Sequence, residues 1–161
     1  MYRDLNLIEH FLSFLPSMTL NDIAQQSAEE TANNPNIAVA RRFIRFMEEM
    51  PGGFFIYRAD GNEEIIFANN ALLRIFRCDT MAEFMELTHG SFKGLVHPDD
   101  LEAVEQSITE QIADSQYDLD YVEYRIVRKD GQIRWLEDYG HFTHTENAGD
   151  FFYVFVGDAT E

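Results

Sequence analysis

The chain has few basic residues and a single cysteine. It holds 12 Lys and Arg against 29 Asp and Glu among 161 residues, a formal net charge of −17 at pH 7. Such an acidic surface repels phosphate groups, which argues against binding to nucleic acid or to an anionic membrane surface. Cys78 has no second cysteine to pair with, so the chain forms no internal disulfide, as suits a reducing compartment.

Long apolar runs are also missing. No segment has the length and hydropathy of a transmembrane helix. The N-terminus lacks the basic start and uninterrupted apolar stretch of a signal peptide. We therefore expect a cytoplasmic protein that does not contact a membrane.

Familiar catalytic and metal-binding motifs are absent. The chain contains no Gly-rich phosphate loop, no His-Glu-x-x-His and no Gly-x-Ser-x-Gly. Among the five histidines only His141 and His144 are close, and an odd separation on a strand points two side chains to opposite faces. The acids Asp99 and Asp100 suit the positive end of a helix that begins at Pro98. We expect neither an enzyme nor a metal site in this chain.

What is present is a globular composition, 45% hydrophobic and 14% aromatic, arranged in two blocks. Residues 1–50 carry helical spacing only, with apolar residues three or four apart over 5–15 and again over 37–50. Pro51-Gly52-Gly53 ends the second helix. We expect residues 1–50 to form a helical extension and residues 51–161 to form the main domain.

The second block combines strands with short helices. Strands are predicted over 54–58, 64–68, 117–128, 132–143 and 151–156, and the Asp130-Gly131 turn marks a long hairpin. Asn69 and Thr80 have the positions of helix N-caps, and a loop containing Gly90 and Gly94 precedes the helix at Pro98. This order indicates an α+β fold with helices on one face of an antiparallel sheet.

Four short motifs of this block occur in a characteristic order. They are Ile65-Ile66-Phe67-Ala68-Asn69-Asn70-Ala71; Val96-His97-Pro98-Asp99-Asp100; Glu123-Tyr124-Arg125 with Lys129-Asp130-Gly131 and Trp135; and Gly157-Asp158-Ala159-Thr160. In this order and at this spacing they resemble the PAS family of sensor domains, over about residues 52–161. The resemblance implies a five-stranded sheet of order 2-1-5-4-3 with short helices over its inner face.

The resemblance also implies a function in signal transduction. Such modules usually precede an effector, a histidine kinase or a diguanylate cyclase, and Asp158 and Thr160 occupy the positions of signal output. No effector is contained in these 161 residues. The expectation is therefore a cytoplasmic sensory module, of a two-component or related system, that acts on a C-terminal effector.

Two cofactors of the family are disfavoured. Haem-binding relatives carry a histidine on the long helix, and residues 99–113 contain none. The flavin-binding branch needs an Asn-Cys-Arg motif, which is missing, and alignment of the turns and chain ends places Ile126, Leu136 and Val156 at its polar flavin contacts. The identity of any cofactor stays open.

Strand alternation predicts an apolar interior on the inner face of the sheet. The candidate lining residues are Leu73, Phe76, Leu95, Val104, Ile108, Tyr124, Ile126, Leu136, Phe152, Val154 and Val156. One interpretation is a packed core. The other is a pocket for a small apolar or aromatic ligand, with the Tyr124 hydroxyl as its polar contact.

The same alternation points large apolar side chains outward. They are Tyr121, Val127, Trp135, Tyr139, Tyr153 and Phe155, and an outer-face ion pair between Glu123 and Arg125 is expected beside them. A face of this kind indicates an interface. The helix over 37–50, through Val39, Phe43 and Phe46, is predicted to cover this face or a second copy of it, which would give a homodimer. A monomer that covers its own sheet is the alternative, and a ligand-free interaction and dimerisation module is the second functional interpretation.

Overall fold

The computed structural model describes residues 35–146 and 148–159 and divides the chain into two units, with the first passing into the second after Glu49. The predicted division at residue 50 stays a prediction. The helix predicted over 5–15 and the C-terminal Thr160 lie outside the described residues. No helix among the described residues is long and apolar enough to cross a membrane.

Helix α4, Pro35–Glu48, belongs to the first unit, which also includes Thr145–Gly149. Proline is favoured in the first turn of a helix, and Arg45 in the last turn complements the negative helix end. The helix predicted over 37–50 is therefore present, and it begins and ends two residues earlier than predicted. Phe46 is 63% exposed, whereas Phe43 is half-buried.

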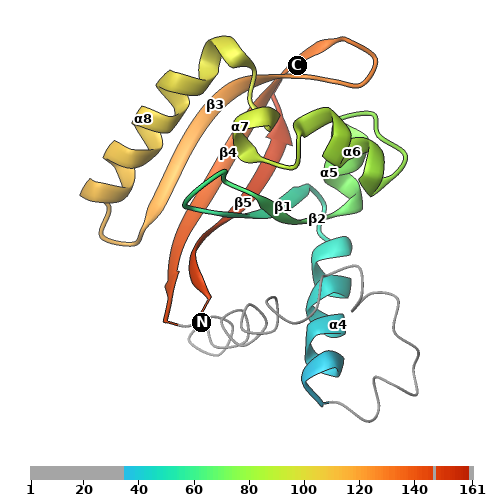
Figure 1. Ribbon diagram of the computed structural model, residues 1–161, viewed down its shortest axis with the longest axis vertical. Helices are drawn as coiled ribbons and strands as arrows, with labels where there is room; N and C mark the ends of the chain where they lie inside the picture. The colour runs from blue at the N-terminus through green and yellow to red at the C-terminus, as the bar shows by residue number, and fades with distance from the viewer. Residues whose placement is uncertain (1–34, 147, 160–161) are drawn as a thin grey trace. The chain divides into compact units, whose positions relative to one another are not determined.

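The second unit is built on a five-stranded sheet in the order β2-β1-β5-β4-β3 (Figure 1). The strands are β1 Gly53–Arg58, β2 Ile65–Ala68, β3 Leu119–Val127, β4 Ile133–Thr145 and β5 Gly149–Asp158. β1 pairs antiparallel with both β2 and β5, and β3 pairs antiparallel with β4. The predicted order and the long hairpin are confirmed.

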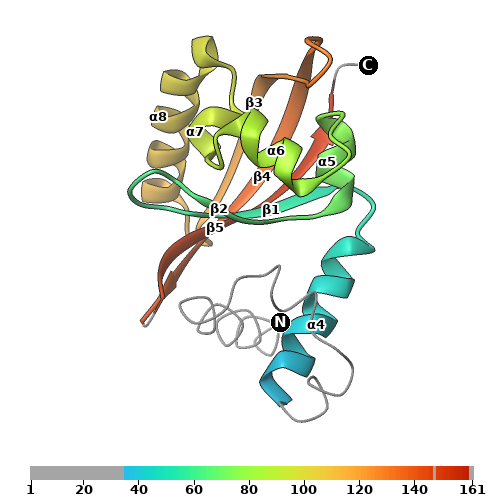
Figure 2. The ribbon, with the colours of Figure 1, turned by 45° about the vertical axis from the view of Figure 1, so that its right-hand side comes forward.

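Four helices gather on one side of this sheet (Figures 1 and 2). They are α5 Asn70–Ile75, α6 Met81–Thr88, α7 Phe92–Leu95 and α8 Pro98–Asp114, the last running beside β3. Their N-caps follow the sequence, because the side chains of Asn69 and Thr80 accept backbone hydrogen bonds from Leu72 and Glu83.

The one-turn helix α7 falls where the sequence predicted only a loop. The Ser91 hydroxyl caps it by accepting a 3.0 Å hydrogen bond from the Gly94 amide. Four residues are too few to show a helical period, so the spacing of apolar residues could not reveal it. The helix places Phe92 in the core, where it is 1% exposed.

The hairpin between β3 and β4 turns at Gly131, whose φ is +85°. Only glycine adopts this conformation at low cost, which explains the Asp-Gly dipeptide. The Asp130 carboxylate accepts a 3.0 Å hydrogen bond from the Gln132 amide, and the Arg128 carbonyl accepts one from Gly131. The pairing sets Tyr124 opposite Leu136 and Asp120 opposite Gly140.

Candidate functional site

The predicted lining residues come together in one interior cluster between the sheet and the helices. All of Leu73, Phe76, Leu95, Val104, Ile108, Tyr124, Ile126, Leu136, Phe152, Val154 and Val156 are buried there. Leu73 of α5, Phe76 directly after it, and the α7 and α8 members lie on the helical side, and the rest lie on β3, β4 and β5. Their placement agrees with strand alternation, and their role in binding stays a prediction.

Aromatic rings fill the middle of this interior. Tyr57 of β1 stacks with Phe92, with ring centroids 4.5 Å apart, and with Phe152, at 5.1 Å. The Tyr124 ring meets Phe92 edge-on at 5.9 Å. The electron-rich ring faces and two phenol groups give this region both an apolar and a polar character.

The interior also contains a buried acid, Asp138 of β4. It is 1% exposed, and its Oδ2 accepts a 2.6 Å hydrogen bond from the Tyr124 hydroxyl. Burial raises the pKa of Asp138 to about 8, the Tyr124 hydrogen bond acts in the opposite direction, and the charge of Asp120 adds to the rise. The Tyr124 hydroxyl, predicted as a polar contact for a ligand, is therefore already donated to a carboxylate.

A second acid, Asp120 of β3, lies near Asp138. It is 6% exposed, and neither carboxylate oxygen has a hydrogen-bond partner among the described residues. The Asp120 carboxylate lies over Gly140. A Cβ atom added at Gly140 would be 2.5 Å from Asp120 Oδ2, so only glycine leaves room for the carboxylate. Burial raises the pKa of Asp120 to about 6. At neutral pH this group is mostly an unpaired buried anion, which is costly to the fold.

A pair of glutamates completes the acidic interior. Glu63, just before β2, lies within hydrogen-bonding reach of Glu105 on α8. Burial, the hydrogen bond with Glu105 and the charge of Glu105 raise the pKa of Glu63 to about 8, while Lys93 lowers it. Glu63 is therefore mostly protonated at neutral pH. The four acids Asp138, Glu63, Asp120 and Glu105 all raise the pKa of the Tyr57 phenol, after burial as the main cause.

No basic side chain among the described residues forms an ion pair with Asp120 or Asp138. The described part of the chain also holds no group of three or more His, Cys, Asp or Glu arranged to bind a metal ion. The interior thus combines buried carboxyl groups with aromatic rings. That combination suits a positively charged or hydrogen-bond-donating organic molecule better than a purely apolar one.

The sequence did contain the signal for these acids. Alternation that points Val122 and Tyr124 inward also points Asp120 inward, and Asp138 shares a face with Leu136. The predicted interior was apolar apart from the Tyr124 hydroxyl, and it lacked the buried acids Asp120 and Asp138. Glu63 and Glu105 are 42 positions apart, so no local spacing could have joined them.

On the outer face, most predicted side chains are exposed. Trp135 is 44% exposed and Tyr139 53%, while Phe155 is half-buried. Tyr153 differs from the others, because it is 8% exposed and its ring stacks with His141. The side chain of Val39 lies outside the described residues.

The expected ion pair between Glu123 and Arg125 is wrong. The Arg125 guanidinium instead donates to both carboxylate oxygens of Asp100, at 2.7 and 3.0 Å, and Asp100 also accepts a hydrogen bond from the Arg125 amide at 2.8 Å. Glu123 accepts a 2.7 Å hydrogen bond from the Tyr121 hydroxyl. Asp100 therefore joins the start of α8 to the middle of β3, beyond its expected contribution to the helix end.

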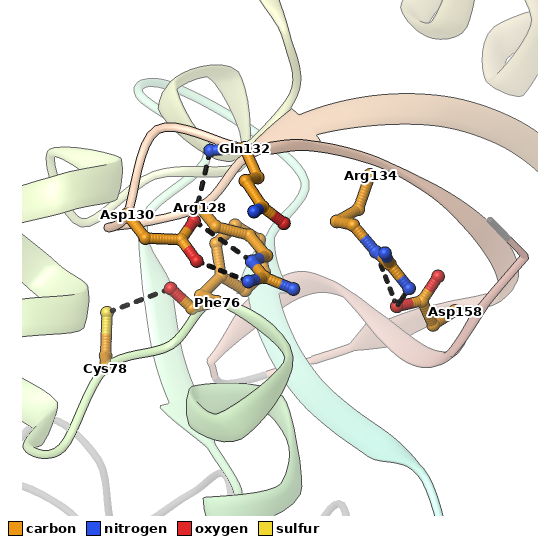
Figure 3. A network of polar contacts seen from close by, with 7 residues as sticks. All are labelled: Phe76, Cys78, Arg128, Asp130, Gln132, Arg134 and Asp158. Carbon is orange, nitrogen blue, oxygen red and sulfur yellow. Dashed lines mark hydrogen bonds and ion pairs between the residues drawn. The ribbon is translucent and has the colours of Figure 1, made fainter.

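The C-terminal strand ends in a polar network shown in Figure 3. Arg134 donates to Asp158 Oδ2 at 2.9 and 3.1 Å, while Arg128 pairs with Asp130 at the hairpin turn (Figure 3). The Ala159 amide donates to the Trp135 carbonyl at 2.8 Å. Asp158, predicted for signal output, is thus tied to β4, and Thr160 lies outside the described residues.

Comparison with known proteins agrees with this architecture. The family model described as the PAS fold matches residues 65–156, more than half of the chain. The chain belongs to the PAS family. No curated protein matches the sequence significantly.

Solved PAS domains share the fold at low identity. The PAS domain of an HTR-like protein from Haloarcula marismortui has a TM-score of 0.55 and 21% identity, over 81% of this chain and 93% of that one. A PAS domain of a two-component sensor histidine kinase has a TM-score of 0.57 and 15% identity, over 73% and 94%. A LuxR-family transcriptional regulator from Burkholderia thailandensis, solved with ethanol, has a TM-score of 0.55 and 22% identity, over 73% and 96%. At such identities the likeness shows the fold alone.

Proposed function

We propose that this PAS domain is a non-catalytic sensory module that binds a small ligand in its interior and regulates an effector domain. The effector would be a histidine kinase or a diguanylate cyclase that follows the PAS domain in a longer cytoplasmic protein. Membership of a family whose solved members include parts of a sensor kinase and a transcriptional regulator supports this proposal.

One observation carries the ligand-binding part of the proposal. Asp120, Asp138 and the Tyr57 phenol converge in an aromatic interior, and the Asp120 carboxylate has no partner there. Polar groups that converge inside an apolar enclosure are typical of a ligand site. A core selected for packing alone gains nothing from an unpaired buried anion.

The signal from the ligand site would reach the effector domain through the end of β5. Ligand binding on the inner face would change the relative stability of two arrangements of the sheet, and the ligand would favour the one that it binds better. The Arg134–Asp158 ion pair and the Ala159 hydrogen bond couple β4 to the last described residues of β5. A change in β4 would thereby reach the segment that leads to the effector.

Native mass spectrometry of the freshly purified chain, repeated under denaturing conditions, tests the proposal. Extra mass in the native spectrum that disappears on denaturation is the expected result. A bare native mass for the chain isolated directly from cell lysate, together with no binding in a broad metabolite screen, would contradict ligand sensing.

A second candidate function is dimerisation without a ligand. The outer face of β3 and β4 exposes Trp135, Tyr139 and Tyr121, a patch of the kind that marks an interface. Under this candidate a second copy of the chain covers the patch. Light scattering should give a dimer mass that Tyr139→Lys reduces to a monomer mass, while Tyr117→Lys, an exposed residue before β3, leaves the dimer intact. A monomer mass for the unaltered chain at high concentration would reject it.

A further inference from the structure

The unpaired carboxylate of Asp120 indicates which charge a ligand in the interior would carry. Both of its oxygens are buried without a hydrogen-bond partner, although the residue is only 6% exposed. The neighbouring Asp138 carboxylate has one donor, the Tyr124 hydroxyl, and no basic side chain of the described residues pairs with either acid. Buried carboxylates require donors or a positive charge, so a bound molecule that supplies both would remove the penalty.

The surrounding rings favour the same kind of ligand. Tyr57 and Tyr124 lie close enough to Asp120 and Asp138 to feel their charges, and Phe92 and Phe152 stack with Tyr57. The phenol oxygens of Tyr57 and Tyr124 can also accept hydrogen bonds from an ammonium group. The described residues hold no grouping with the ligand number that a metal ion needs, which directs the choice to an organic cation.

We propose that the ligand is a small protonated amine whose ammonium group pairs with the ionised Asp120 and donates a hydrogen bond to Asp138, while its carbon skeleton lies among the apolar side chains around Tyr57 and Phe152. This inference rests on the proposed function and names the ligand class for that site. An ammonium group offers three N–H donors, enough to satisfy both Asp120 oxygens and one oxygen of Asp138. A neutral or anionic ligand would leave the Asp120 charge unpaired.

The titratable groups around the site fix the expected pH dependence. Asp120 on β3 faces Asp138 on β4, with Tyr57 on β1 and Tyr124 on β3, while Glu63 and Glu105 lie near Tyr57. Lys93 on α7 is the cation that acts on Glu63. Because the amine binds the ionised form of Asp120, its affinity should increase as the pH rises from about 5 to about 7.5.

Calorimetric titration of the full chain tests the inference with methylamine, butylamine and benzylamine, each against its matched neutral alcohol. At least one amine should bind tightly enough to measure, and its alcohol should bind about tenfold more weakly or not at all. Asp120→Asn keeps the size of the side chain and removes the charge, so it should weaken amine binding about tenfold or more. Glu123→Gln, on the outer face of the same strand, should leave the affinity unchanged.

A second readout separates binding from a structural role. Without amine, Asp120→Asn should be at least as stable to urea as the unaltered chain at pH 8, because it removes an unpaired buried charge. If it does not fold, Asp120→Ser, which also removes the charge, replaces it in the titration. Equal affinity for amine and alcohol, unchanged affinity in the variants, or no binding by any of the three amines would overturn the inference. A neutral or anionic ligand retained in the native mass spectrum would also overturn the inference but would leave the proposed sensory function in place. A bare native mass together with no binding in the metabolite screen would contradict both the amine ligand and ligand sensing.

Discussion

The Tyr124 hydroxyl donates a 2.6 Å hydrogen bond to Oδ2 of Asp138, and both residues are at most 1% exposed. Tyr124 lies on β3 and Asp138 on β4, so the bond joins the two strands on the inner face of the sheet. Within the described part of the chain it is the one hydrogen bond to the Asp138 carboxyl group, and the neighbouring Asp120 carboxylate has none there. This arrangement gives a set of predictions about stability as well as binding.

Tyr124→Phe should destabilise the fold by about 1–3 kcal/mol, because it leaves a buried carboxyl group without its donor. It should also raise the pKa of Asp138 further, since the hydrogen bond favours the ionised form. Urea denaturation at neutral pH measures the first effect. Tyr121→Phe, which removes an exposed hydrogen bond to Glu123, should change stability by no more than about 0.5 kcal/mol. Equal effects of the two variants would argue against the buried bond.

Asp138→Asn should become progressively more stabilising, relative to the unaltered chain, as the pH rises. The folded-state pKa of about 8 lies above the unfolded value of about 3.9, so the folded state is penalised wherever the unfolded chain has lost its proton. The contribution of Asp138 to stability is therefore most favourable below about pH 4 and is lost between about pH 4 and pH 8. The asparagine carbonyl can still accept the Tyr124 hydrogen bond.

Urea denaturation at several pH values between about 5 and 8 measures this trend. The stability difference between Asp138→Asn and the unaltered chain should grow by at least about 1 kcal/mol over this range. Glu137→Gln, at the neighbouring position on β4, serves as the control and should give a nearly constant difference. A pH-independent difference for Asp138→Asn would show that Asp138 titrates normally.

Gly140→Ala should destabilise the fold by about 1–3 kcal/mol, because the added Cβ atom would stand 2.5 Å from Asp120 Oδ2. The cost should come from Asp120 itself. A double-mutant cycle with Asp120→Ala should therefore recover about 1 kcal/mol or more of it. Gly157→Ala on β5, which meets no atom within 4 Å, is the matched control and should be nearly neutral. Strict additivity in the cycle would contradict the close contact.

Asp100→Asn should cost about 1–2 kcal/mol at neutral pH, because it weakens a bidentate pair with Arg125. Arg125 lowers the pKa of Asp100, so this stabilisation exists above the unfolded pKa of about 3.9 and disappears as the pH falls through the folded value. Thermal unfolding at about pH 7 and pH 3 should show the difference shrinking. Asp99→Asn, whose side chain is 76% exposed, should cost no more than about 0.5 kcal/mol at either pH.

Much of the fold could be predicted because local chemistry and tertiary structure agree. The caps at Asn69 and Thr80, the Asp130-Gly131 turn and the strand alternation each specify a local conformation that the structure adopts. Helix α7 escaped prediction because a single turn carries no period. The bounds of α4 differ by two residues because Pro35 suits the first turn of a helix.

The site was only half predictable. The apolar lining followed from alternation, but Asp120 and Asp138 were missed although the same alternation turns them inward. Arg125 pairs with Asp100 and not with Glu123, because the fold brings the start of α8 to β3 and gives a bidentate, partly buried ion pair. Contacts of this kind, like that of Glu63 with Glu105, depend on tertiary packing that residue spacing does not encode.

The most direct test of the interior site is a pH titration of the Asp120 and Asp138 carboxyl carbons by NMR, with and without the tightest-binding of the three amines. In the free chain, we predict midpoints of about 6 and about 8 for these two residues. The amine should lower the Asp120 midpoint by about one unit or more, because a tenfold preference for the ionised form corresponds to one pKa unit. Midpoints near 4 in the free chain, or midpoints that the amine does not move, would contradict the account.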